Sequence, residues 1–447
     1  MTPAPGTLDS DTVGGDLYSS AMARIRFGTF LAPHHPIGES PTHQFRRDLE
    51  MATHLDQLGF DEFWCGEHHS TGWEMIANPE MFLAAAAMVT HRIKLGTGVI
   101  SLPYHHPFNV AQRIVQLDHM SQGRAMFGSG PGALPSDAKM LGIDPMTQRD
   151  KQDEALGVII RLLRGERFSY ESDWFTLNDA ALQILPVQDD MSMTCASSIS
   201  PSGMTLAGKY GIGALSIAST SSEGIQALPT QWKFAETAAA EHGQTVDRRD
   251  WRVLMSWHIA ETRGKAKDEA MLGLQKWHNE YNVRVLGRPG AQWVDDPEEL
   301  FAQVAQGGAE GGGAAVVGTP DDLIEAVMNL QEVTGGFGVV LGFAHDWANV
   351  ENTKRSWDLV ARYVVPAVNG TIRPQIASAE YVEARKSELM AGASAAVMSK
   401  IMSDPNAAAA MATTMQQVAA RAAKAKEQGD SENDPVFRPG GGLPADA

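Results

Sequence analysis

Short apolar runs recur along this chain, and nearly all of them lead into a polar loop and then a longer stretch with helical spacing of apolar residues. The runs lie at residues 25–31, 62–65, 93–102, 125–128, 193–198, 213–217, 252–260, 314–318 and 338–342. Helical spacing is found at 41–58, 79–90, 108–121, 148–164, 203–209, 221–242, 320–333 and 351–369. This alternation predicts an α/β protein with a parallel sheet. About eight strand–helix units favour a (β/α)8 TIM barrel over the alternative, a doubly wound open sheet.

Two stretches of the chain break this alternation. Residues 261–315 hold one predicted helix and then a Gly-, Asp- and Gln-rich segment, so we expect an insertion that acts as a lid late in the barrel. From 371 to 427 the chain is rich in Ala, Met, Glu and Lys, which predicts a C-terminal helical extension. The barrel is then expected at 24–370, between a flexible leader at 1–23 and a disordered tail at 428–447.

Charge and composition argue against several classes of protein. The chain has 447 residues and a formal net charge of −18, with no basic stripe, so we do not expect a nucleic-acid partner. No apolar run reaches the roughly 18 residues of a membrane span, and the N-terminus lacks the layout of a signal peptide. Cys65 and Cys195 lie far apart, which indicates a reducing compartment. We therefore expect a cytoplasmic protein without a membrane partner.

Histidines gather in three of the predicted strand-end loops. They are His34 and His35, then His68 and His69 directly after Glu67, and then His105 and His106. Loops at the carboxyl ends of barrel strands meet on one face, where barrel enzymes carry their active sites. Histidine is the side chain best suited to moving a proton near neutral pH, although an adjacent pair is more often structural. Adjacent histidines without a completing Cys or Asp pattern do not predict a metal site.

Two further loops have the composition of ligand-binding backbone. Ser197, Ser198, Ser200 and Ser202 precede a predicted helix, so their hydroxyls and the first N–H groups can cradle a phosphate or simply cap the helix. The segment 128–132, which contains Ser129 and Gly130, can let a flat ring or a phosphate approach closely, but it lacks the spacing of a dinucleotide fingerprint. Thr97, Gly98 and Val99 in a buried strand also suggest a close approach to a ligand.

Taken in order, the motifs resemble those of the bacterial luciferase-like flavin monooxygenases over residues 25–369. The resemblance rests on Phe27-Gly28-Thr29-Phe30-Leu31, Gly59-Phe60-Asp61-x-x-Trp64-x-x-Glu67-His68-His69, Asn78-Pro79, Leu95-Gly96-Thr97-Gly98-x-x-x-Leu102-Pro103-x-x-His106-Pro107, Leu117-Asp118-x-Met120-Ser121-x-Gly123-Arg124, Phe127-Gly128, Val317-Gly318-Thr319-Pro320 and Thr334-Gly335-Gly336-Phe337-Gly338. Ser200-Pro201-Ser202 with Leu206-Ala207-Gly208, and Ala344-His345-Asp346, resemble the branch that holds diketocamphane monooxygenases and limonene monooxygenase-like proteins.

This resemblance implies a two-component enzyme that takes reduced FMN from a separate NAD(P)H-dependent flavin reductase. Dioxygen would add to the flavin C(4a) carbon, and the resulting peroxide would oxygenate the substrate. His68 matches the family's catalytic histidine and would handle the proton, with Glu67 beside it. The family's non-prolyl cis peptide would fall at Gly98–Val99, and Ser198 and Ser202 match its phosphate-binding stretch.

The expected substrate is a small apolar molecule, such as a cyclic ketone or a terpenoid, in a pocket lined by His35, Trp73, Tyr104, His106 and Phe343. A homodimer is also expected. The chain departs from the luciferase α subunit, which has Cys-Arg where Gly130 and Pro131 stand, so an arginine contact to the phosphate and light emission are unsupported. The alternatives are a deazaflavin- or FMN-dependent dehydrogenase on the same barrel, and a non-catalytic flavin-binding protein.

Overall fold

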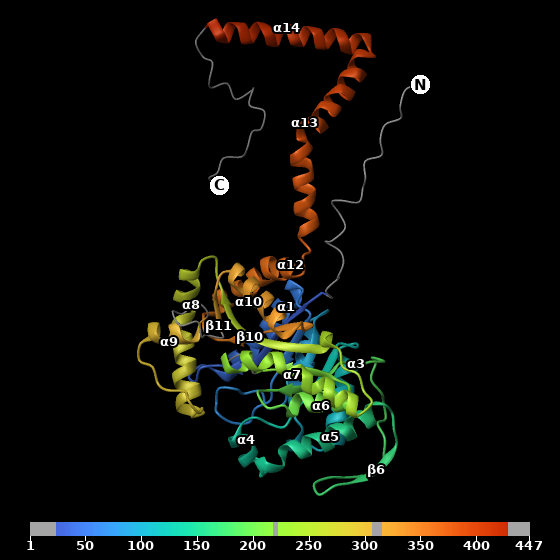
Figure 1. Cartoon of the computed structure of the whole chain (residues 1–447), viewed down its shortest axis with the longest axis vertical. Coiled ribbons are helices and arrows are strands. Elements are labelled where there is room, and N and C mark those ends of the chain that lie inside the picture. The colour runs from blue at the N-terminus through green and yellow to red at the C-terminus, as the bar shows by residue number, and fades with distance from the viewer. Residues whose placement is uncertain (1–23, 218–221, 306–314, 428–447) are drawn as a thin grey trace. The chain divides into compact units, whose positions relative to one another are not determined.

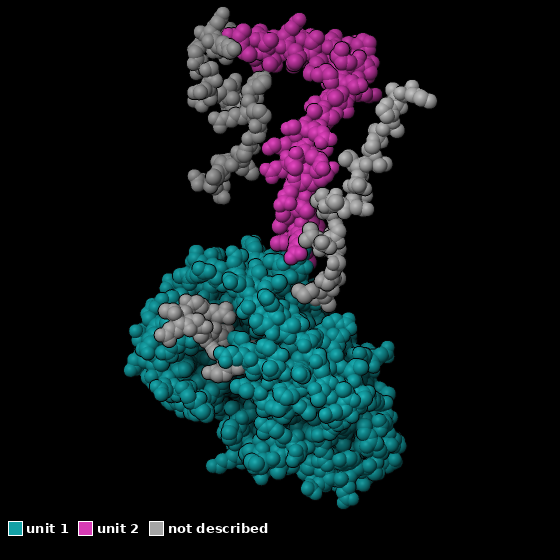
Figure 2. All heavy atoms as spheres, in the orientation of Figure 1, with its two compact units in different colours: residues 1–370 teal, residues 371–447 magenta. Residues whose placement is uncertain are grey.

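The computed structural model describes residues 24–217, 222–305 and 315–427. The chain divides into two compact units, 1–370 and 371–447, which Figure 2 colours separately. The expected leader at 1–23 and tail at 428–447 lie outside the described residues. Within the described ranges, no helix combines the length and the apolar character needed to cross a membrane.

The first unit is a closed barrel of eight parallel strands, which confirms the predicted fold. In barrel order these strands are β1 (Arg26–His34), β2 (Glu62–Cys65), β3 (Lys94–Thr97), β5 (Ala125–Gly130), β8 (Met193–Ser197), β9 (Gly213–Ser216), β10 (Trp251–Ile259) and β12 (Val339–His345). Strand β12 closes the ring because it pairs with both β10 and β1.

Helices surround the strands and follow the predicted alternation (Figure 1). They are α1 (Pro41–Leu58), α2 (Pro79–Val89), α3 (Pro107–Met120), α5 (Gln148–Leu163), α6 (Ser202–Tyr210), α7 (Ser222–Glu241), α8 (Arg263–Lys276), α10 (Pro320–Thr334), α11 (Val350–Leu359) and α12 (Val365–Val368). Helix α1 ends at Gly59, whose φ of 86° is the left-handed conformation that favours glycine at this position.

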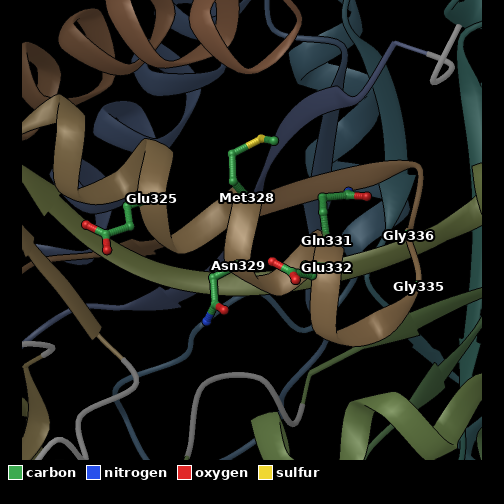
Figure 3. A pocket seen from close by; sticks show the side chains of 7 residues that line it. All are labelled: Glu325, Met328, Asn329, Gln331, Glu332, Gly335 and Gly336. Carbon is green, nitrogen blue, oxygen red and sulfur yellow. The ribbon is translucent and has the colours of Figure 1, made fainter. Parts of the chain in front are cut away.

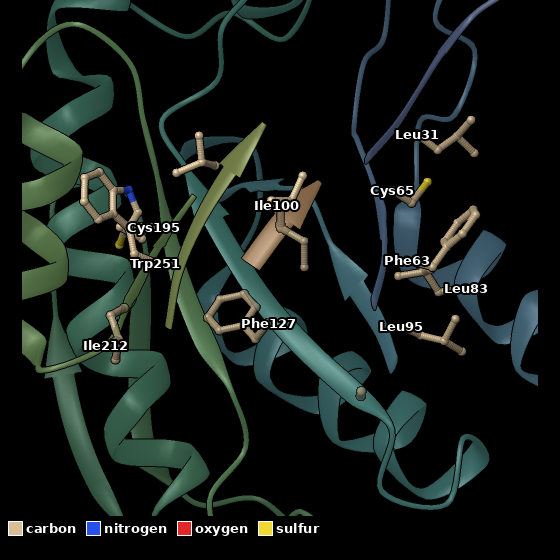
Figure 4. Close-up of a cluster of buried hydrophobic side chains, with 14 of the residues drawn as sticks. Leu31, Phe63, Cys65, Leu83, Leu95, Ile100, Phe127, Cys195, Ile212 and Trp251 are labelled. Carbon is tan, nitrogen blue, oxygen red and sulfur yellow. The ribbon is translucent and has the colours of Figure 1, made fainter. Parts of the chain in front are cut away.

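Strand side chains alternate between two apolar layers. One layer fills the barrel and includes Phe30, Trp64, Met126, Leu254 and Leu341. The other lies between the strands and the helices, and Figure 4 shows part of it, with Phe63, Leu83, Leu95, Phe127 and Trp251 among its members. This alternation follows from the period-2 geometry of a strand whose two faces are both covered.

Two predicted strands differ from the structure. The run at 314–318 was counted with the barrel strands, but β11 (Ala315–Gly318) pairs with the second half of β10 and with no other barrel strand in the described residues. The first half of β10 pairs with β12, so the strand leaves the barrel wall midway. The run at 93–102 is divided into β3 and β4 (Ile100–Ser101) by a cis peptide bond at Gly98–Val99.

The hydrophobic pattern did not predict several of the helices and strands. A hairpin, β6 (Phe168–Glu171) and β7 (Thr176–Ala180), precedes β8, and a short helix, α4 (Pro135–Met140), follows β5. The segment expected to be an insertion contains a π-helix (Trp277–Val285) that continues α8, and then helix α9 (Pro297–Val304). Residues 306–314 of the expected lid lie outside the described residues. The second unit holds α13 (Arg373–Met402) and α14 (Pro405–Glu427).

Candidate active site

Glu67 is a buried carboxylate that ties two strand-end loops together. Its Oε1 accepts hydrogen bonds from Nε2 of His69 at 2.8 Å and from Nε2 of His105 at 2.6 Å. Its Oε2 accepts from the backbone N–H of Ser101 at 2.6 Å. Burial alone would raise the pKa of Glu67, but His105 and His69 outweigh it, and the pKa falls below its usual value. Glu67 therefore stays ionised and orients the loops after β2 and β4.

His68 stands between two carboxylates. Its Nδ1 lies 3.1 Å from Oδ2 of Asp137, in α4, and its Nε2 lies 3.4 Å from Oε1 of Glu74. Burial disfavours the charged form of the ring, but Glu74 and Asp137 more than offset it, so the pKa of His68 is raised. The backbone N–H of His68 donates to the carbonyl of Ile76 at 3.1 Å, which fixes the loop that carries the ring. The two carboxylates therefore favour the charged, proton-donating form of the ring.

Glu74 connects His68 to two further residues. Its Oε1 also lies 3.0 Å from Nε2 of His34 at the end of β1, and its Oε2 accepts a hydrogen bond from the hydroxyl of Tyr281 in the π-helix. Burial opposes ionisation, but His68 and His34 outweigh it and lower the pKa of Glu74 to about 2. One carboxylate therefore joins the ends of β1 and β2 and the crossover after β10.

The predicted cis peptide at Gly98–Val99 is confirmed, and it lies between β3 and β4 at the strand-end face. The N–H of Gly98 donates to the carbonyl of Cys65 at 2.6 Å, which places the cis bond beside the loop that carries Glu67 and His68. A Cβ on Gly98 would press against Phe30 and Trp64 in the barrel interior. Glycine at 98 is therefore required by close packing.

The serine-rich loop after β8 is divided between the core and the surface. Ser198 and Ser202 are exposed at the start of α6, and the hydroxyl of Ser202 lies 2.9 Å from that of Ser200. Ser197 is buried instead, and its hydroxyl donates to Oε1 of Gln231 at 3.3 Å. The prediction that the Ser197 side chain binds the cofactor is therefore not supported, because this hydroxyl already anchors the loop to α7.

Ser129 and Gly130 lie at the end of β5 and face opposite sides of the strand. The buried hydroxyl of Ser129 lies 3.4 Å from the carbonyl of Thr194 and 3.4 Å from Sγ of Cys195, in the layer between strands and helices. A Cβ on Gly130 would collide with the side chain of Val99. Gly130 makes room for Val99, whereas the Ser129 hydroxyl is held in the packed layer; the predicted approach of a cofactor to the backbone of this loop stays a prediction.

The predicted pocket residues do not form one wall. His35 is buried between Asp48, 3.0 Å away, and Asp346, 2.7 Å away, so it is part of an ion-pair network and lines no pocket. Trp73 is only 1% exposed and packs on the ring of Tyr281. His106 caps α3 by accepting the N–H of Phe108 through its Nδ1, 3.3 Å away.

Tyr104 and Phe343 remain partly exposed. The Tyr104 hydroxyl accepts from Nε2 of Gln148 at 3.0 Å, and burial raises the pKa of Tyr104 to about 12. Phe343 stacks on the ring of His34, with 5.1 Å between centroids. These two side chains, like that of His106, are therefore partly exposed.

Two hollows on the described surface lie away from His68. One of about 440 Å³ follows the end of α10 and is lined by residues such as Glu325, Met328 and Gly335 (Figure 3). Another, of about 780 Å³, lies at the amino ends of the strands and includes Arg26 and Lys94. Neither contains a predicted site residue. Among the described residues, no group of His, Cys, Asp and Glu is arranged to hold a metal ion.

The site also contains residues that the sequence reasoning missed. Asp137 follows β5, and as a carboxylate after a strand end it had a usable signal. Glu74 lies in the same loop as His68 but had no motif around it. Tyr281 is 207 residues away from Glu74 along the chain and belongs to the segment expected to be a lid, so no local pattern could identify it.

Comparisons with known proteins identify the family of this chain. The family model described as luciferase-like monooxygenase matches residues 25–335. A limonene 1,2-monooxygenase from Rhodococcus erythropolis is 47% identical over 355 residues, which cover 79% of this chain and 89% of that protein. A 4-hydroxyprotoasukamycin monooxygenase from Streptomyces nodosus subsp. asukaensis is 46% identical over 81% of this chain and 97% of that protein.

A solved structure of the oxygenating constituent of 3,6-diketocamphane monooxygenase from Pseudomonas putida, in complex with FMN, superimposes with a TM-score of 0.65 at 27% identity. The superposition covers 77% of this chain and 99% of the diketocamphane monooxygenase chain. These relatives confirm the branch that the motifs predicted. The family match spans most of the barrel, and the two sequence relatives extend over nearly four-fifths of the chain. This chain therefore belongs to the luciferase-like monooxygenase family.

Proposed function

We propose that this chain is the oxygenating component of a two-component flavin monooxygenase that receives reduced FMN from a separate NAD(P)H-dependent reductase. The observation that carries the proposal is His68, which is held between Glu74 and Asp137 at the strand-end face, close to the cis bond at Gly98–Val99. A histidine whose charged form is favoured by two carboxylates is suited to supply a proton to an oxygen atom.

The residues present fit a bound FMN. The hydroxyls of Ser198, Ser200 and Ser202, together with the first N–H groups of α6, would hold the phosphate, because an exposed helix N-terminus favours an anion. The backbone at Gly98–Val99 would face the flat ring. When bound, reduced FMN supplies the electrons that activate dioxygen.

The protein's own residues contribute a proton donor held in one position and loops held in a fixed arrangement around it. His68 supplies the proton from its ring, and Glu74 and Asp137 hold that ring in place and favour its charged form. Glu67 keeps the loops after β2 and β4 together, so that His68 and the cis bond keep their relative positions. The substrate we propose is a small apolar molecule such as a cyclic ketone or a terpenoid. Support comes from the named relatives, one of which is a limonene monooxygenase.

Two alternatives remain distinguishable by experiment. An F420-dependent secondary alcohol dehydrogenase shares the fold, with a TM-score of 0.58 at 21% identity. A dehydrogenase of this kind would transfer hydride without oxygen. A non-catalytic flavin-binding protein would not need the charged network around His68.

The test supplies pre-reduced FMN and a panel of cyclic ketones and terpenes, with and without oxygen. We expect product only in the presence of oxygen, at a rate set by the supply of reduced FMN. Reduction of a deazaflavin by an alcohol without oxygen would favour the dehydrogenase. Oxidation of FMN with no product from any of the panel would favour a binding protein.

A further inference from the structure

Half of the buried polar atoms without a partner in the described residues belong to one group of aromatic rings, which includes His34, a partner of Glu74. Ten buried side-chain nitrogen or oxygen atoms in the described residues have no hydrogen-bond partner. Five of them, which we call the unpaired cluster, are Nδ1 of His34 and His345 and Nε1 of Trp73, Trp277 and Trp347. Buried polar groups are almost always paired, because an unpaired one costs about 1–3 kcal/mol. A concentration at one place therefore points to a ligand.

The rings of the unpaired cluster form one connected set. The ends of β1 and β12 place His34 opposite His345, and Phe343 stacks on both rings, with centroid distances of 5.1 and 4.2 Å. Trp347 stacks on His345 at 4.0 Å, and Trp277 lies 5.1 Å from His345.

Tyr281 joins the rest of the cluster. Its ring lies 4.6 Å from that of His34 and 5.4 Å from that of Trp73. The surroundings of the unpaired atoms are therefore aromatic, and they extend to His34 and Tyr281, two of the residues that contact Glu74.

Glu74 decides which nitrogen of His34 is available. A carboxylate can only accept, so Nε2 of His34 carries the hydrogen that points to Glu74. The Nδ1 atom is left over, and it accepts a hydrogen bond when the ring is neutral and donates one when the ring is charged. The indole N–H groups of the cluster can only donate. An oxygen atom is the partner that suits all of these groups.

We propose that Nδ1 of His34 binds an oxygen function, a hydroxyl or a carbonyl, on an otherwise apolar cyclic substrate. This inference rests on the proposed function and makes it more specific, because it selects oxygenated compounds over plain hydrocarbons. His34 would then hold the substrate while His68, on the same carboxylate, supplies the proton. The aromatic rings around His34 would contact the apolar part of the molecule.

The first test compares three compounds on one ring skeleton: limonene, carveol and carvone. Dissociation constants are measured by quenching of tryptophan fluorescence, with oxidised FMN present and absent, so no turnover is needed. We expect carveol or carvone to bind about tenfold more tightly than limonene, the size of one hydrogen bond in a buried site. Tight binding of carveol but not of carvone indicates an accepting Nδ1, because a carbonyl cannot donate; tight binding of both indicates a donating Nδ1. Equal affinities for all three compounds would overturn the proposal.

Two variants separate binding from a structural role. The amide of His34→Gln reaches the place of Nε2 and keeps the contact with Glu74, whereas that of His34→Asn occupies the place of Nδ1. We expect His34→Gln to reduce the preference for the oxygenated compound to less than about threefold, with limonene affinity unchanged, and His34→Asn to retain the preference. The opposite order would mean that His34 only supports Glu74, and that water fills the site.

Trp277→Phe provides a measurement that does not depend on these variants, since Trp277 is half-buried and the change removes one N–H. We expect about a threefold loss of the preference, and no loss would count against the proposal. The substrate-binding site at His34 and the monooxygenase activity can be refuted separately. A preference without any oxygenation would leave the binding site standing and refute the monooxygenase. Oxygenation without a preference for the oxygenated compound would refute the binding site at His34 and leave the monooxygenase standing.

Discussion

Replacing Glu74 with glutamine should lower the pKa of His68, because it removes one of the two carboxylates that favour the charged ring. The change keeps the shape of the side chain and removes one negative charge, 3.4 Å from Nε2 of His68. The pKa of Glu74 falls from 4.5 to about 2, despite an opposing effect of burial, because of His68 and His34. A fall of that size corresponds to about 3 kcal/mol of net interaction with the carboxylate.

About half of that interaction belongs to His68 if the two histidines share it equally, which is about 1.5 kcal/mol. Coulomb's law with an effective dielectric constant of about 20 gives about 5 kcal/mol at this distance, so the smaller value is conservative. Loss of 1.5 kcal/mol lowers the ratio of charged to neutral His68 by about tenfold at a fixed pH. Turnover that needs the charged ring should therefore decline at a lower pH in Glu74→Gln.

The assay mixes the protein with pre-reduced FMN, substrate and oxygen at pH 6 to 9, so that no reductase limits the rate. The alkaline decline of turnover should begin about one pH unit lower in the variant than in the wild type, and the two should turn over at similar rates on the acidic side of the decline. Glu325→Gln, on the distant surface of α10, serves as the matched control and should leave the profile unchanged. An alkaline decline that does not move in Glu74→Gln, with FMN still bound, would refute the role assigned to Glu74.

Three other predictions follow from named contacts. His68→Ala should lower turnover by about 100-fold or more and leave FMN binding largely intact, as titration of flavin fluorescence would show, and unchanged turnover would remove His68 from the mechanism. Burial lowers the pKa of His35, but Asp346 and Asp48 outweigh it and raise the pKa to about 9. Because the folded-state pKa is raised, the charged ring contributes at most about 3 kcal/mol to the free energy of unfolding. This contribution is complete below pH 6.5 and lost as the pH rises to 9. Urea denaturation should show this decline in the wild type and a flatter profile in His35→Gln, and equal slopes would argue against it. Residues 281–305, the described part of the segment 281–313, should become protected from proteolysis when reduced FMN binds without oxygen, and an unchanged cleavage pattern would count against a lid.

The hydrophobic pattern was sufficient to predict the barrel because each strand is covered on both faces and each helix presents one apolar face. It placed β2 at 62–65 and α1 at 41–58, with the bounds that the structure has. The pattern failed at β11, since a short apolar strand reads the same whether it closes the barrel or only extends β10. It also could not show where one strand is interrupted, because the cis bond at Gly98–Val99 came only from the resemblance.

The site was predictable only where chemistry follows a strand directly. His68 and Glu67 were found in this way, whereas the partners of His68 were not. Glu74 and Tyr281 meet through a contact between distant parts of the chain, which no local spacing encodes. The opposite error occurred at His35 and Ser129, whose positions after strands suggested a site although their side chains point into packed structure. Position along a strand predicts the end of the barrel but not the direction of each side chain.

The central claim is that this chain uses reduced flavin to place one oxygen atom from dioxygen into a small substrate. The most direct measurement is a single turnover of protein with pre-reduced FMN, carvone and ¹⁸O-labelled dioxygen, followed by mass spectrometry of the product. We expect a product that carries one labelled oxygen atom, and a loss of that product in His68→Ala. A product formed equally well without oxygen, or one whose new oxygen atom comes from water, would contradict the account.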